Sequence, residues 1–112
     1  MGPYNQAVKA GNLLFISGQI ALSAVTGALN TNSVEEETHL VMKNLSAILA
    51  EAGTDFTAIV KTTIFLSDME LFAKVNEVYG SYFSGDYPAR ETVAVKGLPK
   101  GVNVEISMIA SL

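Results

Sequence analysis

The order of strand-like and helix-like hydrophobic patterns constrains the fold of this chain more than any other feature. Apolar and polar residues alternate from 102 to 110, which places Val104, Ile106 and Met108 on one face of a strand. Three other runs are rich in strand-forming residues: 13–20, 59–66 and 92–96. Two segments instead repeat apolar residues at helical spacing: 34–52 and 72–83. This order predicts an α+β domain of two layers, in which two helices cover one face of a mixed β-sheet.

Each predicted helix begins at a recognisable signal. Ser33 and Glu36 have the spacing of a capping box, and so do Ser67 and Glu70. In such a box the two side chains satisfy free N–H groups at the start of a helix. Gly53 follows the first helix, where a glycine favours the end of a helix.

Length and composition predict one domain that associates with other subunits. A chain of 112 residues without a linker fits a single domain over 1–112. Apolar residues make up 49% of the chain and charged residues 16%, which is a low charge density for a small protein. The strand at 13–20 is apolar on both faces, so we expect other subunits to cover the outer face of the sheet. The alternative is a compact monomer with an apolar surface.

Charge and cysteine content exclude several classes of function. The net charge is −4 and no run of lysines is present, so a nucleic-acid partner is not expected. Because the sequence has no cysteine, disulfides, thiolate nucleophiles and cysteine-ligated zinc are excluded, and no metal or cofactor is predicted. Polar residues interrupt the uncharged stretch 10–34, so neither a membrane span nor a signal peptide is expected. We expect a cytoplasmic protein.

Arg90 is the only arginine of the chain, and the other six basic residues are lysines. It follows Pro88 and stands just ahead of the predicted strand at 92–96. A guanidinium is always charged and presents a planar fork of donors that fits a carboxylate at two points, which a lysine cannot do. Arg90 is therefore a candidate for holding an anion. The alternative is a surface ion pair with Asp86 or Glu91, worth at most about 1 kcal/mol.

Glu105 is the candidate for proton transfer. It lies on the polar face of an otherwise apolar strand, where a subunit interface would bury it in part. Burial would raise the pKa of its carboxyl toward the range that is useful for moving a proton from water to a leaving group. The alternatives are a carboxylate on a solvated sheet face and an ion pair with a lysine.

Other polar residues have simpler explanations when each is judged alone. Ser17 has no histidine within reach, so it is not expected to act as a nucleophile. His39 lies on the polar side of the first predicted helix and is expected to be solvated. The carboxylates at 35–37 suit the positive end of that helix and need no catalytic role. Asn76 interrupts the apolar stripe of the second helix, so it either bonds locally or lines a site.

Five segments in the same order resemble the Rid family, which is also called YjgF. They are Gly2-Pro3-Tyr4, 14–20, 60–68, 72–79, and 88–106, which opens with Pro88-Ala89-Arg90. The resemblance implies a chorismate-mutase-like fold and a homotrimer, in which three sheets form a central barrel and a site lies at each subunit interface. Members of the family usually begin several residues ahead of this Gly-Pro-Tyr motif, so we expect an edge segment to be missing or trimmed.

The resemblance also implies an activity, the deamination of reactive enamine and imine intermediates. Members similar to this chain hydrolyse 2-imino acids, such as 2-iminopropanoate and 2-iminobutanoate, to 2-oxo acids and ammonia. These imines form from enamines that pyridoxal-phosphate enzymes release. The catalytic arginine and carboxylate of the family fall on Arg90 and Glu105. The positions that match its substrate pocket are Tyr4, Ser17, Gly18, Asn76 and Thr92, together with Glu91 beside the arginine.

One departure and three competing functions accompany this resemblance. Glu91 stands where the family has a small residue, and it either competes with substrate for the guanidinium or points to solvent. A trimeric sensor that binds a small carboxylate without turnover would use the same residues. Chorismate mutase chemistry would need several cationic residues to hold two carboxylates, and a ribonuclease is the weakest option for an acidic chain without a pair of histidines.

Overall fold

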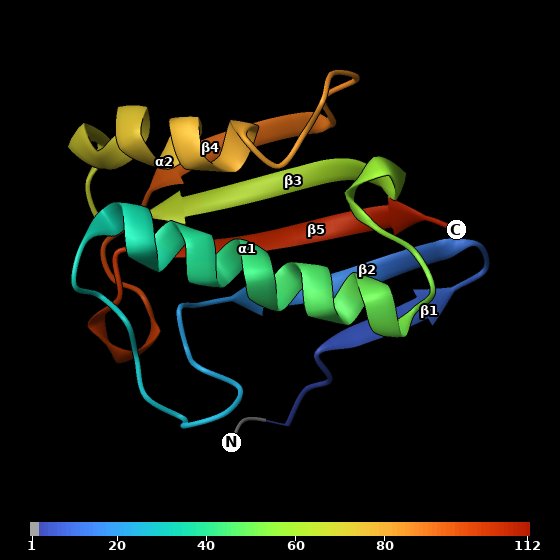
Figure 1. The fold of residues 1–112 in the computed structure, drawn as a ribbon, viewed down its shortest axis with the longest axis horizontal. Helices are drawn as coiled ribbons and strands as arrows, with labels where there is room; N and C mark the ends of the chain where they lie inside the picture. The colour runs from blue at the N-terminus through green and yellow to red at the C-terminus, as the bar shows by residue number, and fades with distance from the viewer. Residues whose placement is uncertain (1–2) are drawn as a thin grey trace.

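The computed structural model describes residues 3–112, and Gly2 of the Gly-Pro-Tyr motif lies outside them. Figure 1 shows one sheet with two helices lying over it, each running along the strands. The strands are β1 (Ala7–Ala10), β2 (Leu13–Gln19), β3 (Ile59–Leu66), β4 (Ala89–Ala94) and β5 (Val104–Ser111). The helices are α1 (Val34–Glu51) and α2 (Phe72–Gly80). Short 3-10 turns occupy 56–58, 69–71 and 99–101.

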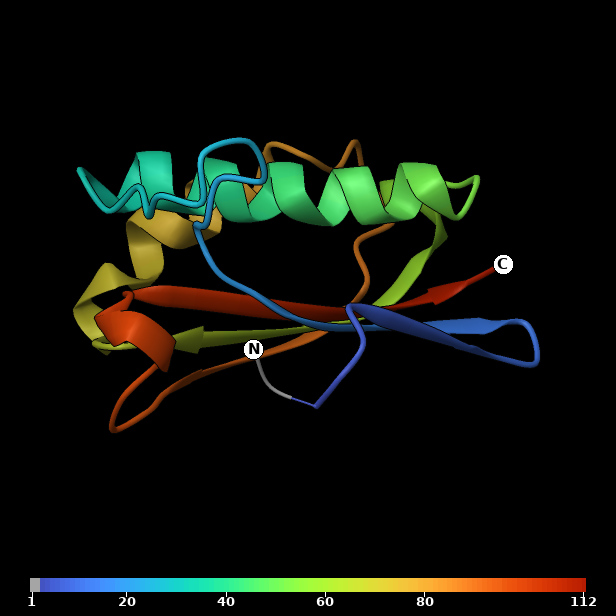
Figure 2. The ribbon, with the colours of Figure 1, turned by 90° about the horizontal axis from the view of Figure 1, so that it is seen from below.

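The two helices lie side by side on one face of the sheet, as Figure 2 shows in edge view. In the part of the chain that the structure describes, no helix covers the opposite face. Phe15 on that face is 42% exposed and Val93 is 41% exposed. The predicted α+β domain of two layers is therefore confirmed. We call this uncovered side the open face.

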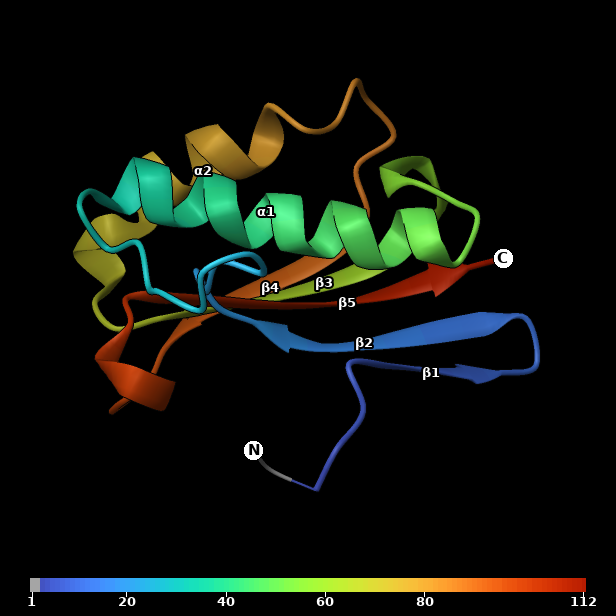
Figure 3. The same ribbon diagram turned by 60° about the horizontal axis from the view of Figure 1, so that its bottom comes forward.

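The sheet is mixed, with the strand order β1-β2-β5-β3-β4 that Figure 3 displays. Strands β1 and β2, β2 and β5, and β3 and β5 pair antiparallel, whereas β3 and β4 pair parallel. A parallel pair needs a crossover between its strands, and α2 supplies it here. The C-terminal strand β5 thus becomes the centre of the sheet.

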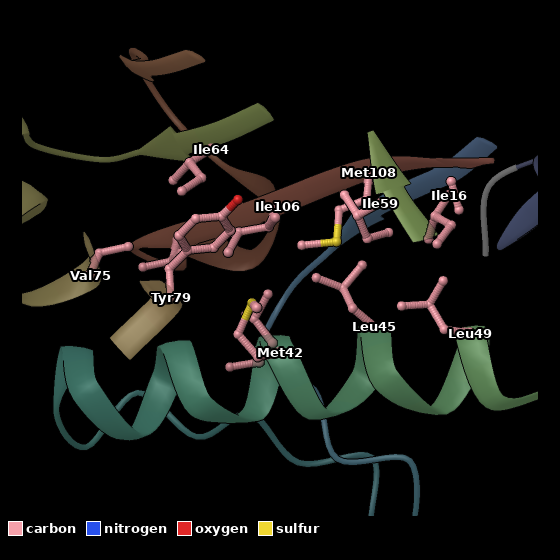
Figure 4. Packing of buried hydrophobic residues seen from close by; sticks show 14 of the residues in the cluster. Ile16, Met42, Leu45, Leu49, Ile59, Ile64, Val75, Tyr79, Ile106 and Met108 are labelled. Carbon is pink, nitrogen blue, oxygen red and sulfur yellow. The ribbon is translucent and has the colours of Figure 1, made fainter. Parts of the chain in front are cut away.

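The core lies between α1, α2 and the sheet. The alternation predicted for the last strand is confirmed, because Val104, Ile106 and Met108 are each at most 2% exposed. Figure 4 shows side chains of α1 reaching across to this face, with Met42 and Leu45 opposite Ile106 and Met108. Residues of β5 between these buried ones are only half-buried, on the open face.

The cap predicted at Ser33 is confirmed and the cap predicted at Ser67 is wrong. Ser33 Oγ accepts the N–H of Glu36 at 3.1 Å, and α1 begins at Val34, as predicted. Ser67 caps no helix, because its hydroxyl donates to Asn103 Oδ1. The carboxylate of Asp68 instead accepts the N–H of Glu70 and opens a 3-10 turn, so that α2 begins only at Phe72.

The bounds of β4 also differ from the prediction. The strand begins at Ala89 and ends at Ala94, whereas alternation predicted 92–96. The reason is its parallel ladder with β3, which pairs Lys61 with Ala89 and continues through Arg90. Arg90 therefore lies inside the strand and not ahead of it. A ladder between distant segments leaves no local signal in the sequence.

Candidate active site

Arg90 lies on the side of β4 that faces the helices, and α2 lies over this strand. It pairs with Thr62 of β3, a fully buried residue beneath the helices. Arg90 Nη1 donates to Asn76 Oδ1 at 2.5 Å. The guanidinium carbon lies 5.6 Å from the ring centroid of Phe72 and 5.3 Å from that of Tyr79, within the range of cation–π attraction. These contacts fix the orientation of the guanidinium.

The free donors of Arg90 lie at an open hollow of about 400 Å³. It is lined by Asn76, Tyr79, Gly80, Tyr87, Pro88 and Arg90. Within residues 3–112, Arg90 makes no ion pair, so neither Asp86 nor Glu91 neutralises it. Only one of its five N–H donors is used by Asn76, which leaves a charged fork for an anion. We call this group the arginine half of the site.

The floor of this hollow is fixed by a buried hydrogen bond. The Tyr79 hydroxyl donates to Thr62 Oγ1 at 3.0 Å. Burial raises the pKa of Tyr79, so the phenol stays neutral and keeps its proton for this bond. Thr92 lies on the same side of β4, and its buried Oγ1 has no hydrogen-bond partner among the described residues.

Glu105 lies on the open face, next to the backbone of Gly18. A side chain at position 18 would collide with the Glu105 carboxyl, so the close approach requires glycine. The ladder between β2 and β5 shifts register between Ile16 and Gln19, and such bulges often re-aim side chains near active sites. Burial raises the pKa of Glu105. In the described chain Glu105 has no lysine partner, so the alternative of an ion pair is not observed.

Ser17 and Tyr4 lie next to Gly18, the first as its neighbour in the chain and the second in a hollow that Gly18 also lines. The Ser17 hydroxyl donates to the carbonyl of Asn5 at 2.6 Å, and the Ser17 N–H donates to the carbonyl of Gln6 at 2.8 Å. Both bonds fasten the segment before β1 to the end of β2. Tyr4 is 62% exposed and lines a second hollow together with Gly18. We call Glu105, Gly18, Ser17 and Tyr4 the carboxylate half of the site.

The two halves face opposite sides of one sheet. Arg90 pairs with Thr62, which points to the helices, whereas Glu105 pairs with Phe65, which points to the open face. Residues that alternate along β3 project to opposite faces. One chain therefore does not bring Arg90 and Glu105 together. Asn76 joins the arginine half, and Gly18, Ser17 and Tyr4 join the carboxylate half.

Glu91 points away from Arg90. As the next residue of β4 it projects to the open face, where its carboxylate lies 3.6 Å from Lys61 Nζ. Glu91 was expected either to compete with substrate for the guanidinium or to point to solvent. Within one chain it does not approach the guanidinium of Arg90. The pair is exposed, and such pairs contribute little to stability.

Sequence reasoning missed Glu37 and misjudged His39 in part. Glu37 is fully buried and accepts three hydrogen bonds from Asn103 and Val104, although it was expected to serve only the helix dipole. Its position one turn before Val41, on the apolar stripe of α1, was the available signal. His39 is exposed as predicted, but its Nδ1 shares a hydrogen bond of 2.8 Å with the Tyr82 hydroxyl.

Neither a metal site nor a membrane span is found in the described chain. Residues 3–112 contain no group of three or more His, Cys, Asp or Glu side chains that could hold a metal ion. No helix in the same range combines the length and the hydropathy needed to cross a bilayer.

Comparison with known proteins decides the family. The family model described as Endoribonuclease L-PSP matches residues 1–112. A Rid-family protein from Yersinia pestis, known from its crystal structure, aligns with a TM-score of 0.97 and 46% identity over 100% of this chain and 90% of that one. The chain belongs to the Rid family. The fold predicted from the resemblance is thereby confirmed.

Two other Rid relatives bear on the chemistry. A mouse protein named 2-iminobutanoate/2-iminopropanoate deaminase is 47% identical over 98% of this chain and 82% of its own length. The crystal structure of TdcF from E. coli with bound serine aligns with a TM-score of 0.94 and 39% identity, over 100% of this chain and 90% of that one.

Proposed function

We propose that this chain hydrolyses 2-imino acids to 2-oxo acids and ammonia, at a site that two copies of the chain complete within a trimer. The observation that carries the proposal is the separation of the two halves. An uncommitted guanidinium lies on one face of the sheet and a carboxyl with a raised pKa lies on the other. A neighbouring copy can supply the half that each chain lacks. The relatives named as deaminases and the TdcF structure with bound serine support a small amino-acid-like substrate.

In this proposal Arg90 binds and orients the substrate. Its free donors hold the substrate carboxylate at two points, and Asn76 and the rings of Phe72 and Tyr79 keep the guanidinium in place. Thr92 and Glu91 remain predicted pocket residues by resemblance. Lysine at position 90 would keep the charge but lose the fork.

Glu105 moves the protons. Its carboxylate takes a proton from water as the water oxygen bonds to the imine carbon, and the imine nitrogen is protonated. The hydroxyl proton of the resulting carbinolamine then passes through Glu105 to the amino group, the carbon–nitrogen bond breaks, ammonia leaves and the carbon–oxygen bond becomes C=O. Water and imine thus give oxo acid and ammonia in balance, without a metal or cofactor in any step. A raised pKa suits a group that must both accept and return a proton near neutral pH.

The family description raises a ribonuclease as a second candidate, and the composition of this chain argues against it. The net charge is −4, and one histidine is present where acid–base cleavage of RNA usually relies on two groups. The chain also lacks the basic residues for a surface that would neutralise phosphates, since it has only seven lysines and arginines.

The cytoplasmic location predicted above fits the imine substrate.

A coupled assay tests the activity. A pyridoxal-phosphate dehydratase supplied with threonine releases the imine, semicarbazide traps it, and active protein diverts it to oxo acid. We expect Arg90→Ala to abolish this diversion, and Arg90→Lys to lose about 100-fold because one point charge replaces the fork. Lys43→Ala, which removes an exposed cation of α1, is the matched control and keeps full activity. If the wild-type protein binds 2-oxobutanoate but diverts no imine, it is a sensor and the enzymatic proposal fails.

Mixing two inactive variants tests the shared site. Arg90→Ala keeps the carboxylate half, and Glu105→Gln keeps the arginine half. When equal amounts are unfolded together and refolded, about a quarter of the sites in a cyclic trimer should pair two intact halves. Recovery of activity in the mixture supports a site between chains. No recovery, when both variants assemble normally, places the site within one chain.

A further inference from the structure

We propose that Glu37 is a positioning residue that fixes the start of β5 and thereby holds Glu105 against Gly18. Glu37 touches neither half of the site, and it acts from the first turn of α1. The inference deepens the proposed function and depends on it for the kinetic test only.

Glu37 grips the backbone at the point where β5 begins. Its Oε2 accepts the N–H groups of Asn103 at 2.7 Å and Val104 at 2.9 Å, and its Oε1 accepts from Asn103 Nδ2 at 2.9 Å. The side chain is 0% exposed, and no cation pairs with it among residues 3–112. A buried carboxylate is costly unless it is well bonded, and charge-assisted bonds to N–H groups are about twice as strong as neutral ones.

The same strand start is held from its other side by Ser67. The carbonyl of Asn103 accepts the Ser67 N–H at 2.9 Å, and Ser67 Oγ donates to Asn103 Oδ1 at 3.1 Å. All four polar groups of Asn103 are therefore bonded, two to α1 and two to the residue that follows β3. We call Glu37, Asn103 and Ser67 the clamp.

The clamp lies directly ahead of Glu105. The preceding turn at 99–101 is irregular, with Lys100 and Gly101 both at positive φ. The ladder with β3 starts at Val104 and reaches Glu105 at the next residue. Without the clamp, the first residues of β5 would have only this strand end to hold them, and strand ends fray most easily. Glu105 would then leave its close approach to Gly18.

A purely stabilising role for Glu37 is the alternative, and kinetics separates the two. We expect Glu37→Ala to lower kcat at least about 10-fold with KM changed less than about 2-fold, because the described bonds of Glu37 go to Asn103 and Val104 and to none of the residues that line the hollow at Arg90. Glu37→Gln should stay within about 3-fold of wild type, since its amide oxygen can still accept both backbone N–H groups. Glu35→Ala is the matched control and should leave both constants unchanged: Glu35 lies in the same turn, and its one ion pair within residues 3–112 is with Lys74 at 3.9 Å.

A second readout does not require activity. The titration of the Glu105 carboxyl, followed by carbon-13 NMR, should move toward that of an ordinary glutamate in Glu37→Ala and stay as in wild type in Glu37→Gln and Glu35→Ala. If Glu37→Ala does not fold, Glu37→Asp replaces it, because the aspartate keeps the charge but is one methylene too short to accept the N–H groups of Asn103 and Val104.

The outcomes distinguish this inference from the proposed function. Folded Glu37→Ala or Glu37→Asp with wild-type kcat and an unchanged Glu105 titration would overturn the positioning role. Wild-type protein without imine hydrolysis would overturn the proposed function, and the Glu105 titration alone would then decide the clamp.

Discussion

Position 18 shows how one residue sets the geometry of the carboxylate half. Gly18 leaves the space that the Glu105 carboxyl occupies, and the nearest atoms that a new Cβ would meet all belong to that flexible side chain, its carboxyl group first. Gly18→Ala should therefore displace the carboxyl and leave the fold intact. We expect imine hydrolysis to fall about 10-fold or more, with the unfolding free energy changed by less than about 1 kcal/mol.

Gly97→Ala is the matched control for this variant. A Cβ at position 97 meets no described atom within 4 Å, so neither rate nor stability should change. Urea unfolding and the coupled assay measure both quantities. Loss of stability in Gly18→Ala with an unchanged rate would contradict the role assigned to the close approach.

Glu105 should also make stability depend on pH. Burial raises its pKa in the folded state above the value in the unfolded chain, so the folded state favours the protonated carboxyl. This contribution is complete below the unfolded pKa and is lost as pH rises through the folded pKa. Glu105→Gln does not titrate, so its stability relative to wild type should increase between about pH 4 and pH 7. Urea unfolding at both values tests this, and a constant difference would show that burial does not disfavour the charge.

At the scale of the elements, α1 organises its surroundings through polar side chains on its buried side. Asn44 Nδ2 donates to the carbonyls of Ile20 at 3.1 Å and Leu22 at 2.9 Å, which fixes the chain just after β2. Asn44→Ala leaves both carbonyls without this partner and should lower the unfolding free energy by about 1–3 kcal/mol. Thermal or urea unfolding measures the loss. Ser46→Ala, two residues on and exposed, should unfold like wild type.

Local patterns predicted the elements whose ends are set locally. The Ser33 cap fixed the start of α1, and period-two alternation identified β5. The start of β4 could not be read in this way, because pairing with β3 decides it. The cap predicted at Ser67 was wrong because Ser67 bonds to Asn103, which is distant in sequence, and Asp68 accepts the Glu70 N–H instead.

The candidate residues of the site were more accessible than its geometry. Residue type and the resemblance together made Arg90 and Glu105 candidates for anion binding and proton transfer, and these roles stay predictions. Their opposite orientation depends on where β4 starts, and the prediction placed that start three residues too late. Glu37 was missed because three consecutive glutamates at a helix start have an adequate electrostatic explanation.

At the scale of the whole molecule, the open face is the surface that a neighbouring chain would cover in the proposed trimer. Phe15 lies there beside its strand partner Ile109 and is 42% exposed. Phe15→Lys would bury a charge in that contact, so we expect monomers that keep the circular dichroism of the folded chain but lose imine hydrolysis. Sedimentation velocity measures the mass.

Val25→Lys is the control for the added charge. Val25 is 94% exposed in the turn after β2, away from the sheet, and this variant should assemble like wild type. Wild-type protein that sediments as a monomer at micromolar concentration would contradict the trimer itself.

The placement of Arg90 and Glu105 on opposite faces has a consequence for how the rate scales with protein concentration. In the proposed trimer, we expect a separated chain to keep its fold but to present Arg90 and Glu105 to solvent, each without its counterpart. On dilution, mass action favours separation, so turnover per chain should decline while circular dichroism stays constant. The protein concentration at which turnover per chain falls to half would then measure the affinity of the chains for one another.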